Sequence, residues 1–338
     1  MKLINTTDLI APGWRFVEDL CPAYDWSFHH GLPTNALERL VRRPNLARYR
    51  AGWQAGRDAA RRAASHGDAV LVSHLPRMAG ATNVARRKFC PEVPQVAFSF
   101  NFTDLPQGAD RRRLSRALVG VAEFVTFTEG ERHLYAETFN QPVERFLHLP
   151  WAMDPPRAGP TNPAPWPDGY FSAIGGEARD YALMARAMRA LPDQKLVIVA
   201  RPHSLAEIDF PTNVAVFANL PAPQTWRIAV DSLGLVIPLR DAATTCGHIT
   251  LVGAQLLGLP LVITRSAGVA DYVDDETAFL VEAGDCDAMV SALGEVAQSR
   301  DAALARAARA QTLARTRSAP QVWADYFHDL SARRSALT

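Results

Sequence analysis

The chain has 338 residues, more than one hydrophobic core usually supports, so two domains are expected. Its formal net charge of +1 gives no bulk electrostatic reason to expect a nucleic-acid partner. A hydrophobic content of 48% with 21% charged residues is typical of a soluble globular protein and excludes a fibrous or disordered chain.

The first half of the chain alternates strands and helices. Short apolar runs predict buried strands at residues 68–73, 95–100, 123–127 and 145–149. Helices are predicted at residues 36–43, 45–64, 82–88, 111–119 and 129–139. Strands separated by helix-length segments predict a parallel sheet covered by helices, so residues 1–150 are predicted to form an α/β domain.

The rest of the chain predicts a linker, a second α/β domain and a terminal helix. Residues 151–167 are dense in proline without a periodic pattern, which is typical of a linker. The second domain is predicted over residues 168–312. Residues 313–338 contain Tyr326, Phe327 and Leu330 at helical spacing. This helix either crosses back onto the first domain or closes its own domain.

Two turns in the second domain lead from an apolar strand toward a helix. One follows Tyr170 and contains Gly175 and Gly176. The other follows the strand at residues 235–237 and contains Gly247, ahead of a predicted helix at residues 249–257 and a strand at 261–264. A helix N-terminus leaves backbone N–H groups unpaired, and a phosphate or diphosphate commonly binds there. The alternative is an ordinary strand–helix–strand unit with a solvated helix end.

The segment from Pro238 to Asp285 resembles the donor-binding end of retaining glycosyltransferases of the GT-B fold, such as the family 4-like bacterial polysaccharide glycosyltransferases. The positions that match the family pattern are Ala254, Gly258, Pro260, Val262, Thr264, Gly268, Asp271, Tyr272, Val273, Leu280 and Val281. The resemblance covers about two-thirds of the chain and is most specific in the second domain. It implies two Rossmann-like domains facing each other across a cleft. It also implies transfer of a sugar from a nucleotide-diphosphate sugar to a glycan or glycolipid, in bacterial surface or exopolysaccharide synthesis.

The resemblance places a basic residue on the donor diphosphate, and Arg179 occupies the matching position. A guanidinium is always charged and binds paired oxygens. The alternative for Arg179 is a surface ion pair with Glu177 or Asp180. Arg201, after the strand at 196–200, is a second candidate for phosphate or base, or it forms a salt bridge. The other donor-side candidates are Gly176, Asp241, Gly247, His248, Ile249 and Thr250.

The sequence departs from the family pattern at the E-x7-E element. Its first glutamate would lie at Thr245 and its second at Gly253, so two charge-assisted hydrogen bonds, each worth roughly 1.5–3 kcal/mol, are missing. His248 either stands in as a donor contact or faces solvent. Thr244 and Thr245 are predicted to cap the following helix. The N-terminal glycine-rich loop of the family is reduced here to Pro12-Gly13.

Acceptor-side candidates follow the predicted strands of the first domain. Asn101 matches the position of a family histidine, and Asp104 lies three residues beyond it. An amide is not a general base, but a retaining enzyme can pass the acceptor proton to the leaving phosphate, whereas inversion would need a base such as Asp104. His74, after the strand at 68–73, is a further candidate. For each of the three, an ordinary loop role is the alternative.

The leaving charge is expected to be balanced by the helix N-terminus and Arg179, with no metal ion and no other cofactor. Two other functions stay open. One is a sugar-nucleotide epimerase, which needs a carboxylate and histidine constellation around the sugar that the sequence does not show. The other is a non-catalytic protein that binds nucleotide sugar or glycan. The missing glutamates favour this second alternative.

We expect a cytoplasmic protein. The four cysteines form no C-x-x-C pair, which indicates neither a zinc site nor a disulfide framework. No apolar run reaches the roughly 18 residues of a membrane span, and the start lacks the apolar core of a secretory signal. The arginine-rich segments at residues 39–62 and 111–116 would allow peripheral contact with anionic lipid. Their alternative is that they are solvated helix faces.

Overall fold

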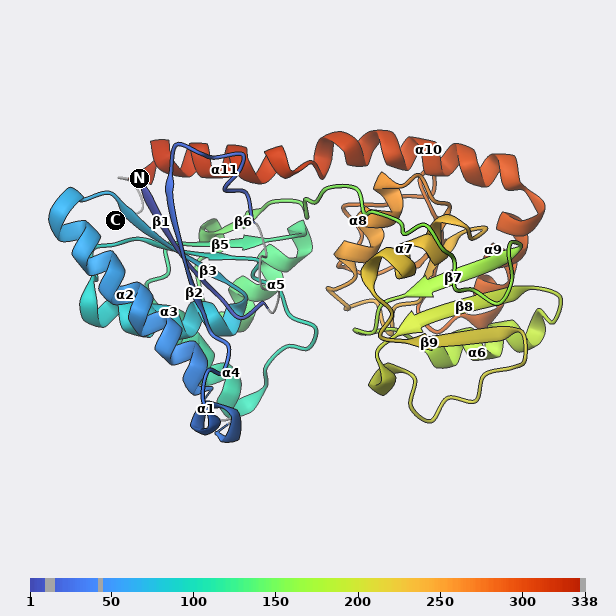
Figure 1. Cartoon of the computed structure of the whole chain (residues 1–338), viewed down its shortest axis with the longest axis horizontal. Coiled ribbons are helices and arrows are strands. Elements are labelled where there is room, and N and C mark those ends of the chain that lie inside the picture. Colours follow the sequence, from blue (N-terminus) through green and yellow to red (C-terminus); the bar gives the residue numbers. More distant parts are fainter. Residues whose placement is uncertain (10–15, 42–44, 335–338) are drawn as a thin grey trace. The chain divides into compact units, whose positions relative to one another are not determined.

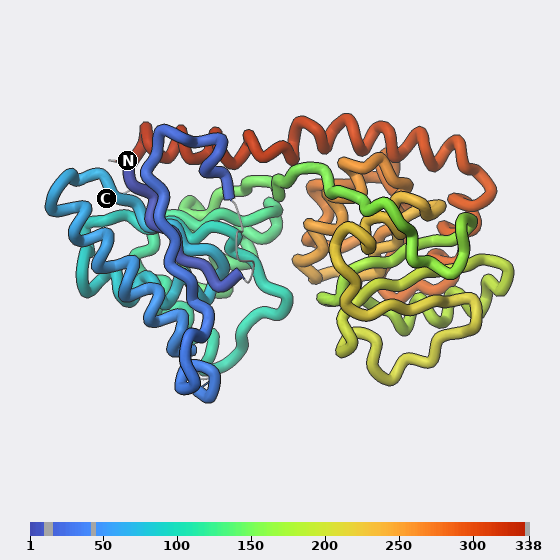
Figure 2. The backbone as a smooth tube through the Cα atoms, in the orientation of Figure 1, coloured from blue at the N-terminus to red at the C-terminus, as the bar shows by residue number. Residues whose placement is uncertain are grey.

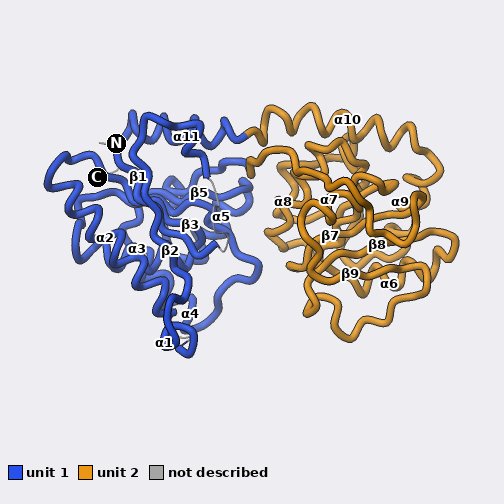
Figure 3. The backbone as a smooth tube through the Cα atoms, in the orientation of Figure 1, with its two compact units in different colours: residues 1–150, 320–338 blue, residues 151–319 orange. Residues whose placement is uncertain are grey.

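The computed structural model describes residues 1–9, 16–41 and 45–334. It contains two compact units, shown in different colours in Figure 3: residues 1–150 with 320–338, and residues 151–319. Each unit has one six-stranded parallel sheet with helices beside it (Figure 1). The chain passes from the first unit to the second after residue 150 and returns after residue 319, which can be followed by colour in Figure 2.

The sheet of the first unit has the strand order β2-β1-β3-β4-β5-β6. Its strands are β1 (Lys2–Thr7), β2 (Asp25–His30), β3 (Ala69–His74), β4 (Gln95–Phe98), β5 (Glu123–Thr126) and β6 (Phe146–His148). Its helices are α1 (Ala36–Leu40), α2 (Leu46–His66), α3 (Pro76–Phe89), α4 (Gly108–Leu118), α5 (Glu129–Phe139) and α11 (Pro320–Ala332), with the short 3-10 turn η1 (Val143–Arg145). The apolar runs of β3, β4 and β5 are buried along their length, as strands covered on both faces require.

Helix α5 begins at a capping box. The Thr128 hydroxyl accepts a hydrogen bond from the Glu131 N–H, and the Glu131 carboxylate accepts one from the Thr128 N–H. Both groups would otherwise be unpaired at the helix start. Helix α5 is observed at Glu129–Phe139, the same limits as the predicted helix, because the capping residues directly precede the helical pattern in the sequence.

The C-terminal helix α11 packs within the first unit. Its Phe327 stacks against Phe98 of β4 with ring centroids 5.7 Å apart, and Trp323 meets the same ring at 5.2 Å. The buried Glu123 of β5 accepts a hydrogen bond of 2.6 Å from the Tyr326 hydroxyl and forms an ion pair with Arg333. The helix is therefore fixed by aromatic packing and by one buried carboxylate.

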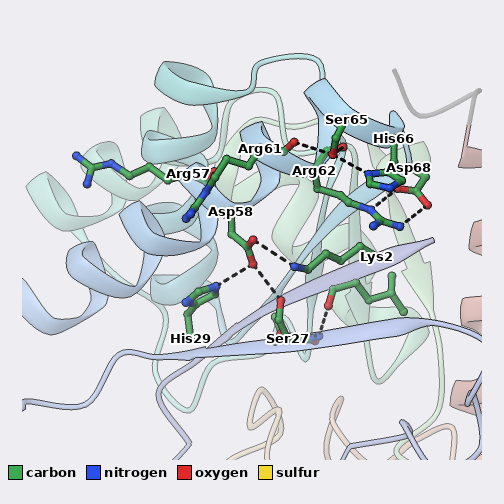
Figure 4. Close-up of polar contacts among 12 residues, drawn as sticks. Lys2, Ser27, His29, Arg57, Asp58, Arg61, Arg62, Ser65, His66 and Asp68 are labelled. Carbon is green, nitrogen blue, oxygen red and sulfur yellow. Dashed lines mark hydrogen bonds and ion pairs between the residues drawn. The ribbon is translucent and has the colours of Figure 1, made fainter.

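Figure 4 shows how α2 is joined to the edge of this sheet. Asp58 accepts hydrogen bonds from Lys2 of β1 at 3.2 Å and from Ser27 of β2 at 3.3 Å, and His29 lies 3.5 Å from the same carboxylate. The pKa of the His29 imidazole is lowered, and burial is the largest cause of this shift. At the end of α2, the Arg62 guanidinium lowers the pKa of Asp68 to about 2.

The second unit has the strand order β12-β11-β10-β7-β8-β9. Its strands are β7 (Tyr170–Ile174), β8 (Lys195–Ala200), β9 (Val214–Ala218), β10 (Leu235–Ile237), β11 (Leu261–Thr264) and β12 (Phe279–Val281). Its helices are α6 (Tyr181–Ala190), α7 (Ala222–Val230), α8 (His248–Leu256), α9 (Cys286–Gln298) and α10 (Arg300–Arg317), with the 3-10 turn η2 (Pro202–Ser204). The strand order reverses between β7 and β10, and parallel α/β sheets bind ligands at such a reversal.

Several elements differ from the sequence-based expectations. Strands β1 and β2 were not predicted, and α3 starts at Pro76 rather than at residue 82. The proline-rich residues 151–167 contain no helix or strand and lie in the second unit, where Gly159 donates to the Pro223 carbonyl. Helix α10 continues to Arg317, so the break before the last helix falls later than residue 313. Pro12, Gly13, Arg42 and Arg43 lie outside the described residues.

Candidate functional site: a guanidinium beneath a helix N-terminus

The loops that follow β7 and β10 are joined at the carboxyl edge of the second sheet. Arg179 forms an isolated antiparallel bridge with Leu239. On either side, the Asp180 N–H donates to the Pro238 carbonyl at 2.7 Å, and the Arg240 N–H donates to the Ala178 carbonyl at 3.1 Å. The loop after β7 is thereby held against the loop that leads into α8.

Two glycines allow the first loop to turn so sharply. Gly175 has a φ of +104°, a value that other residues rarely adopt. A Cβ on Gly176 would lie 2.7 Å from the Ser204 hydroxyl, which itself donates to the Gly176 carbonyl at 2.9 Å. The predicted candidate Gly176 therefore lets the backbone approach η2 closely.

Helix α8 starts without a side-chain cap. Its N-cap is Gly247, with a φ of 114°, and this residue makes no side-chain cap hydrogen bond to the helix. The prediction that Thr244 or Thr245 caps this helix is wrong. The Thr244 hydroxyl instead donates to Asp241 at 3.0 Å, and the Thr244 carbonyl accepts from the Gly268 N–H. The uncapped N–H groups give this end of α8 a partial positive charge.

The Arg179 side chain lies beside this helix start. Its guanidinium donates to the Glu177 carbonyl at 2.9 Å and to the Thr250 hydroxyl at 3.4 Å. A Cβ built on Gly247 would be 3.5 Å from Nη1, so the guanidinium lies next to the helix N-cap. The residue is only 9% exposed.

Arg179 has no carboxylate partner among the described residues, in contrast to the surface ion pair considered as its alternative. Its buried Nε also has no hydrogen-bond partner in the described part of the chain. A buried cation next to the positive end of a helix is unfavourable unless an anion shares the site. The arrangement therefore suits an anion that contacts the α8 amides and the guanidinium together.

Arg201 and Asp241 are arranged differently from Arg179. Arg201 forms an ion pair with Glu177 at 2.8 Å, and its side chain is 65% exposed. The salt bridge named as its alternative is therefore present. Asp241 is exposed and accepts hydrogen bonds from the Ala243 N–H and the Thr244 hydroxyl, so it shapes a local turn.

The first turn of α8 presents one exposed and two buried side chains. Ile249 is 55% exposed. His248 is buried, with its ring 5.2 Å from that of Tyr272, so the solvent-facing position named as its alternative is not observed. Thr250 is buried and contacts Arg179. The structure thus brings Gly247, Thr250 and Arg179 together.

The positions of the absent glutamates have other occupants. A Cβ on Gly253 would lie 2.3 Å from the Trp226 ring and 3.0 Å from Pro156, so the backbone of α8 approaches both closely. Thr245 is buried, and a Cβ on Gly268 would be 2.6 Å from its Cα. A glutamate at position 253 would require Trp226 to move.

The acceptor-side candidates follow β3 and β4 in the first unit. His74 is fully buried, 3.0 Å from the Asn5 side chain and edge-on to Phe16, and burial lowers the pKa of its imidazole to about 3. These contacts give His74 a packing role. Asn101 is half-buried and Asp104 is exposed, both in the loop between β4 and α4.

Sequence reasoning missed the contributions of Glu177 and Cys246 to the second-unit site. The Glu177 carbonyl holds the Arg179 guanidinium, while its carboxylate holds Arg201. The Cys246 thiol lies 3.6 Å from the same carbonyl, and burial raises its pKa. A backbone carbonyl leaves no mark in a sequence, so the pairing of two arginines by one residue could not be foreseen.

Among the described residues, no group of three or more His, Cys, Asp or Glu side chains is arranged to hold a metal ion. None of the described helices combines the length and apolarity needed to cross a bilayer.

No family model matches this sequence, and no curated protein matches it by sequence. Solved structures do match. HepE from Anabaena in complex with UDP-glucose aligns with a TM-score of 0.70 at 12% identity, over 98% of this chain and 100% of that one. Sucrose-phosphate synthase from Thermosynechococcus elongatus aligns with a TM-score of 0.75 at 11% identity, over 100% of both chains.

An α,α-trehalose-phosphate synthase (UDP-forming) from Burkholderia vietnamiensis aligns with a TM-score of 0.71 at 14% identity, over 99% of this chain and 98% of that one. Identities this low bear on the fold alone. The chain therefore has the two-domain α/β fold of the GT-B glycosyltransferases.

Proposed function

We propose that this protein is a glycosyltransferase that moves a sugar from a nucleotide-diphosphate sugar to a glycan or glycolipid, with retention of configuration. We further propose that the reaction belongs to bacterial surface or exopolysaccharide synthesis. The observation that carries the proposal is the buried Arg179 guanidinium, which has no carboxylate partner among the described residues and lies beside the uncapped start of α8. The UDP-glucose bound to HepE supports a nucleotide sugar as the ligand class.

In this proposal the donor diphosphate binds the N–H groups of His248, Ile249 and Thr250 together with Arg179. The bond between the anomeric carbon and the phosphate oxygen breaks, and the leaving nucleoside diphosphate keeps the electron pair. The helix N-terminus and the guanidinium balance this charge in place of a metal ion. Because both groups are already in position, the reaction needs no rearrangement of charge around them.

The acceptor hydroxyl forms the new bond to the anomeric carbon on the face from which the phosphate leaves. Its proton passes to the leaving phosphate oxygen, so no protein base is required. The amide of Asn101 is compatible with this route, since an amide cannot accept a proton at neutral pH. We propose that Asn101 and Asp104 orient the acceptor.

Calorimetric titration with UDP-glucose tests the donor site. We expect Arg179→Gln to weaken binding at least tenfold, because loss of a charge-assisted contact is worth about 1.5–3 kcal/mol. Arg186→Gln is the matched control, since Arg186 is an exposed arginine on α6 of the same unit. Equal affinity of the two variants, with circular dichroism showing both folded, would contradict the proposed donor site.

A second candidate is a non-catalytic protein that binds nucleotide sugar or glycan. The specific observation in its favour is the Trp226 ring beside Gly253, where the resembling enzymes carry a glutamate. Release of UDP from UDP-glucose in the presence of acceptor extract separates the two functions. Arg179-dependent binding without any release would support the non-catalytic candidate.

A further inference from the structure

The first unit contains a cavity of about 950 Å³ that the donor site does not include. Its walls come from the starts of α2 and α3 and from residues along α4, and α3 neighbours both of the other helices (Figure 1). The polar side chains lining it are Asn45, Arg48, Tyr49, Arg77, Gln107 and Arg113, and Asp110 is the acidic residue among them.

The topology explains why three helix starts meet here. In a parallel sheet, each connecting helix begins near the carboxyl edge of the strand before it. Helix α3 begins two residues after β3, and α4 follows the loop after β4. The helices have 21, 14 and 11 residues, and neither α3 nor α4 has a side-chain cap. The cavity therefore lies at positive helix ends.

The guanidiniums on the cavity wall outnumber the carboxylates that pair with them. Arg48 pairs with Asp8, and Arg77 pairs with Asp110 at 2.7 Å. Arg113 is exposed and has no ion-pair partner among the described residues. Among the described residues, three arginines and Asp110 line the cavity, and Asp8 pairs with one of these arginines, so one of the three guanidiniums has no carboxylate partner there. Arginine binds phosphate oxygens in pairs, which a neutral glycan does not offer.

Small residues also line the cavity. A Cβ on Gly80 would lie 3.0 Å from the Leu114 side chain and 3.2 Å from Ala117, so α3 and α4 are in close contact here. Gly80, Ala81, Ala109 and Ala117 add no charge to its wall. A ligand would thus meet guanidiniums beside small apolar residues.

We propose that this cavity binds a phosphate or diphosphate group of the acceptor substrate. As a statement about the acceptor, this rests on the proposed function, because only a transferase has an acceptor. The cavity borders the loop of Asn101 and Asp104, since Gln107 on its wall ends that loop. The guanidiniums of the cavity would hold the acceptor by its anionic group while its hydroxyl extends toward that loop.

Pyrophosphate is the probe for the cavity, titrated into the full chain carrying Arg179→Gln so that the donor site does not contribute. We expect the added pair Arg77→Gln and Arg113→Gln to raise the dissociation constant at least tenfold. Arg112→Gln on the same background is the matched control, because Arg112 is an exposed arginine of α4 that does not line the cavity. The proposal would be overturned if the Arg77 and Arg113 changes and the Arg112 control weakened pyrophosphate binding equally. It would also be overturned if the Arg179→Gln chain with no further change did not bind pyrophosphate.

Titration of UDP-glucose separates this proposal from the donor-site proposal. Suppose that the variant with both Arg77→Gln and Arg113→Gln (the cavity pair) binds pyrophosphate more weakly, but the unsubstituted chain does not bind UDP-glucose. The anion site is then supported and the transferase function is rejected. If UDP-glucose binds in an Arg179-dependent way while the cavity pair behaves like the Arg112 control, only the cavity proposal fails.

Two further arms identify the source of the phosphate. Co-sedimentation with phosphatidylcholine vesicles containing phosphatidic acid, reduced by the Arg77 and Arg113 changes, would indicate a lipid-borne group. Titration with glucose 1-phosphate, weakened by the same changes, would indicate a soluble one. Either result supports the cavity as a phosphate site of the stated source, and failure of both arms would reject it.

Discussion

At the scale of single residues, the surroundings of Arg179 and Gly253 are both fixed by other parts of the second unit. Arg179 is placed by backbone contacts on both sides, the bridge to Leu239 and the Glu177 carbonyl, so its guanidinium is held before any ligand arrives. Such preorganisation lowers the ordering cost of binding. At Gly253, by contrast, the Trp226 ring occupies the space of a side chain.

Gly253→Glu tests whether the lost glutamate can be restored. We expect it to lower the free energy of unfolding by about 1–3 kcal/mol, because the new side chain overpacks against Trp226. Adding Trp226→Ala should recover part of this loss. Gly294→Ala is the control, since Gly294 lies in α9 with no atom within 4 Å of a built Cβ, and alanine is favoured there by up to about 1 kcal/mol. Urea denaturation measures all four proteins, and a stable Gly253→Glu variant would contradict the packing argument.

At the scale of elements, helix α11 depends on one buried carboxylate. Tyr326→Phe removes the hydroxyl that donates to Glu123 and should cost about 1–3 kcal/mol of unfolding free energy. Tyr24→Phe, which removes an exposed hydroxyl that contacts His328 on the same helix, should change stability by less than about 0.5 kcal/mol. Equal losses in thermal or chemical unfolding would show that Glu123 does not fix the helix.

The sequence predicts strands best where apolar residues run together, as in β3, β4 and β10. Strand β1 was not predicted because Asn5 and Thr6 are polar although they are buried. The Thr6 hydroxyl forms a hydrogen bond of 2.8 Å with the Thr82 hydroxyl. The start of α3 was missed because Pro76 and Gly80 argue against a helix. Proline is tolerated at the first helical position, and Gly80 is needed for the contact with α4.

The candidate site was predictable only in part, because residues far apart in the sequence meet in it. Gly247 could be singled out from the local strand–turn–helix pattern, and Arg179 from the resemblance to the family. The contact between the Arg179 guanidinium and Thr250 joins residues far apart in sequence and depends on two loops meeting. The burial of His74 was not predicted, because it comes from Phe16, Phe98 and other rings that no local pattern connects to it.

At the scale of the whole molecule, buried histidines make stability depend on pH. Burial holds the pKa of His74 at about 3, whereas the same residue in the unfolded chain titrates near 6.5. The unfolded state therefore binds the proton first. The stability from neutral His74 is full above about pH 6.5 and is lost as pH falls from there toward 3, by at most about 1.4 kcal/mol per pH unit.

His74→Gln removes this titration. We expect its unfolding free energy, measured by urea denaturation, to fall less steeply than that of the unsubstituted chain between about pH 6 and pH 4. His66→Gln is the control because His66 is exposed at the end of α2. A slope in His74→Gln as steep as in the control would mean that His74 is not held neutral by the fold.

The measurement that tests the central claim most directly is a crystal structure of the full chain with UDP-glucose. We predict diphosphate density within hydrogen-bond distance of the backbone N–H groups of residues 248–250 and of the Arg179 guanidinium. Density for the nucleotide at another place on the second unit, or no density under saturating UDP-glucose, would contradict the claim that this helix start is the donor site.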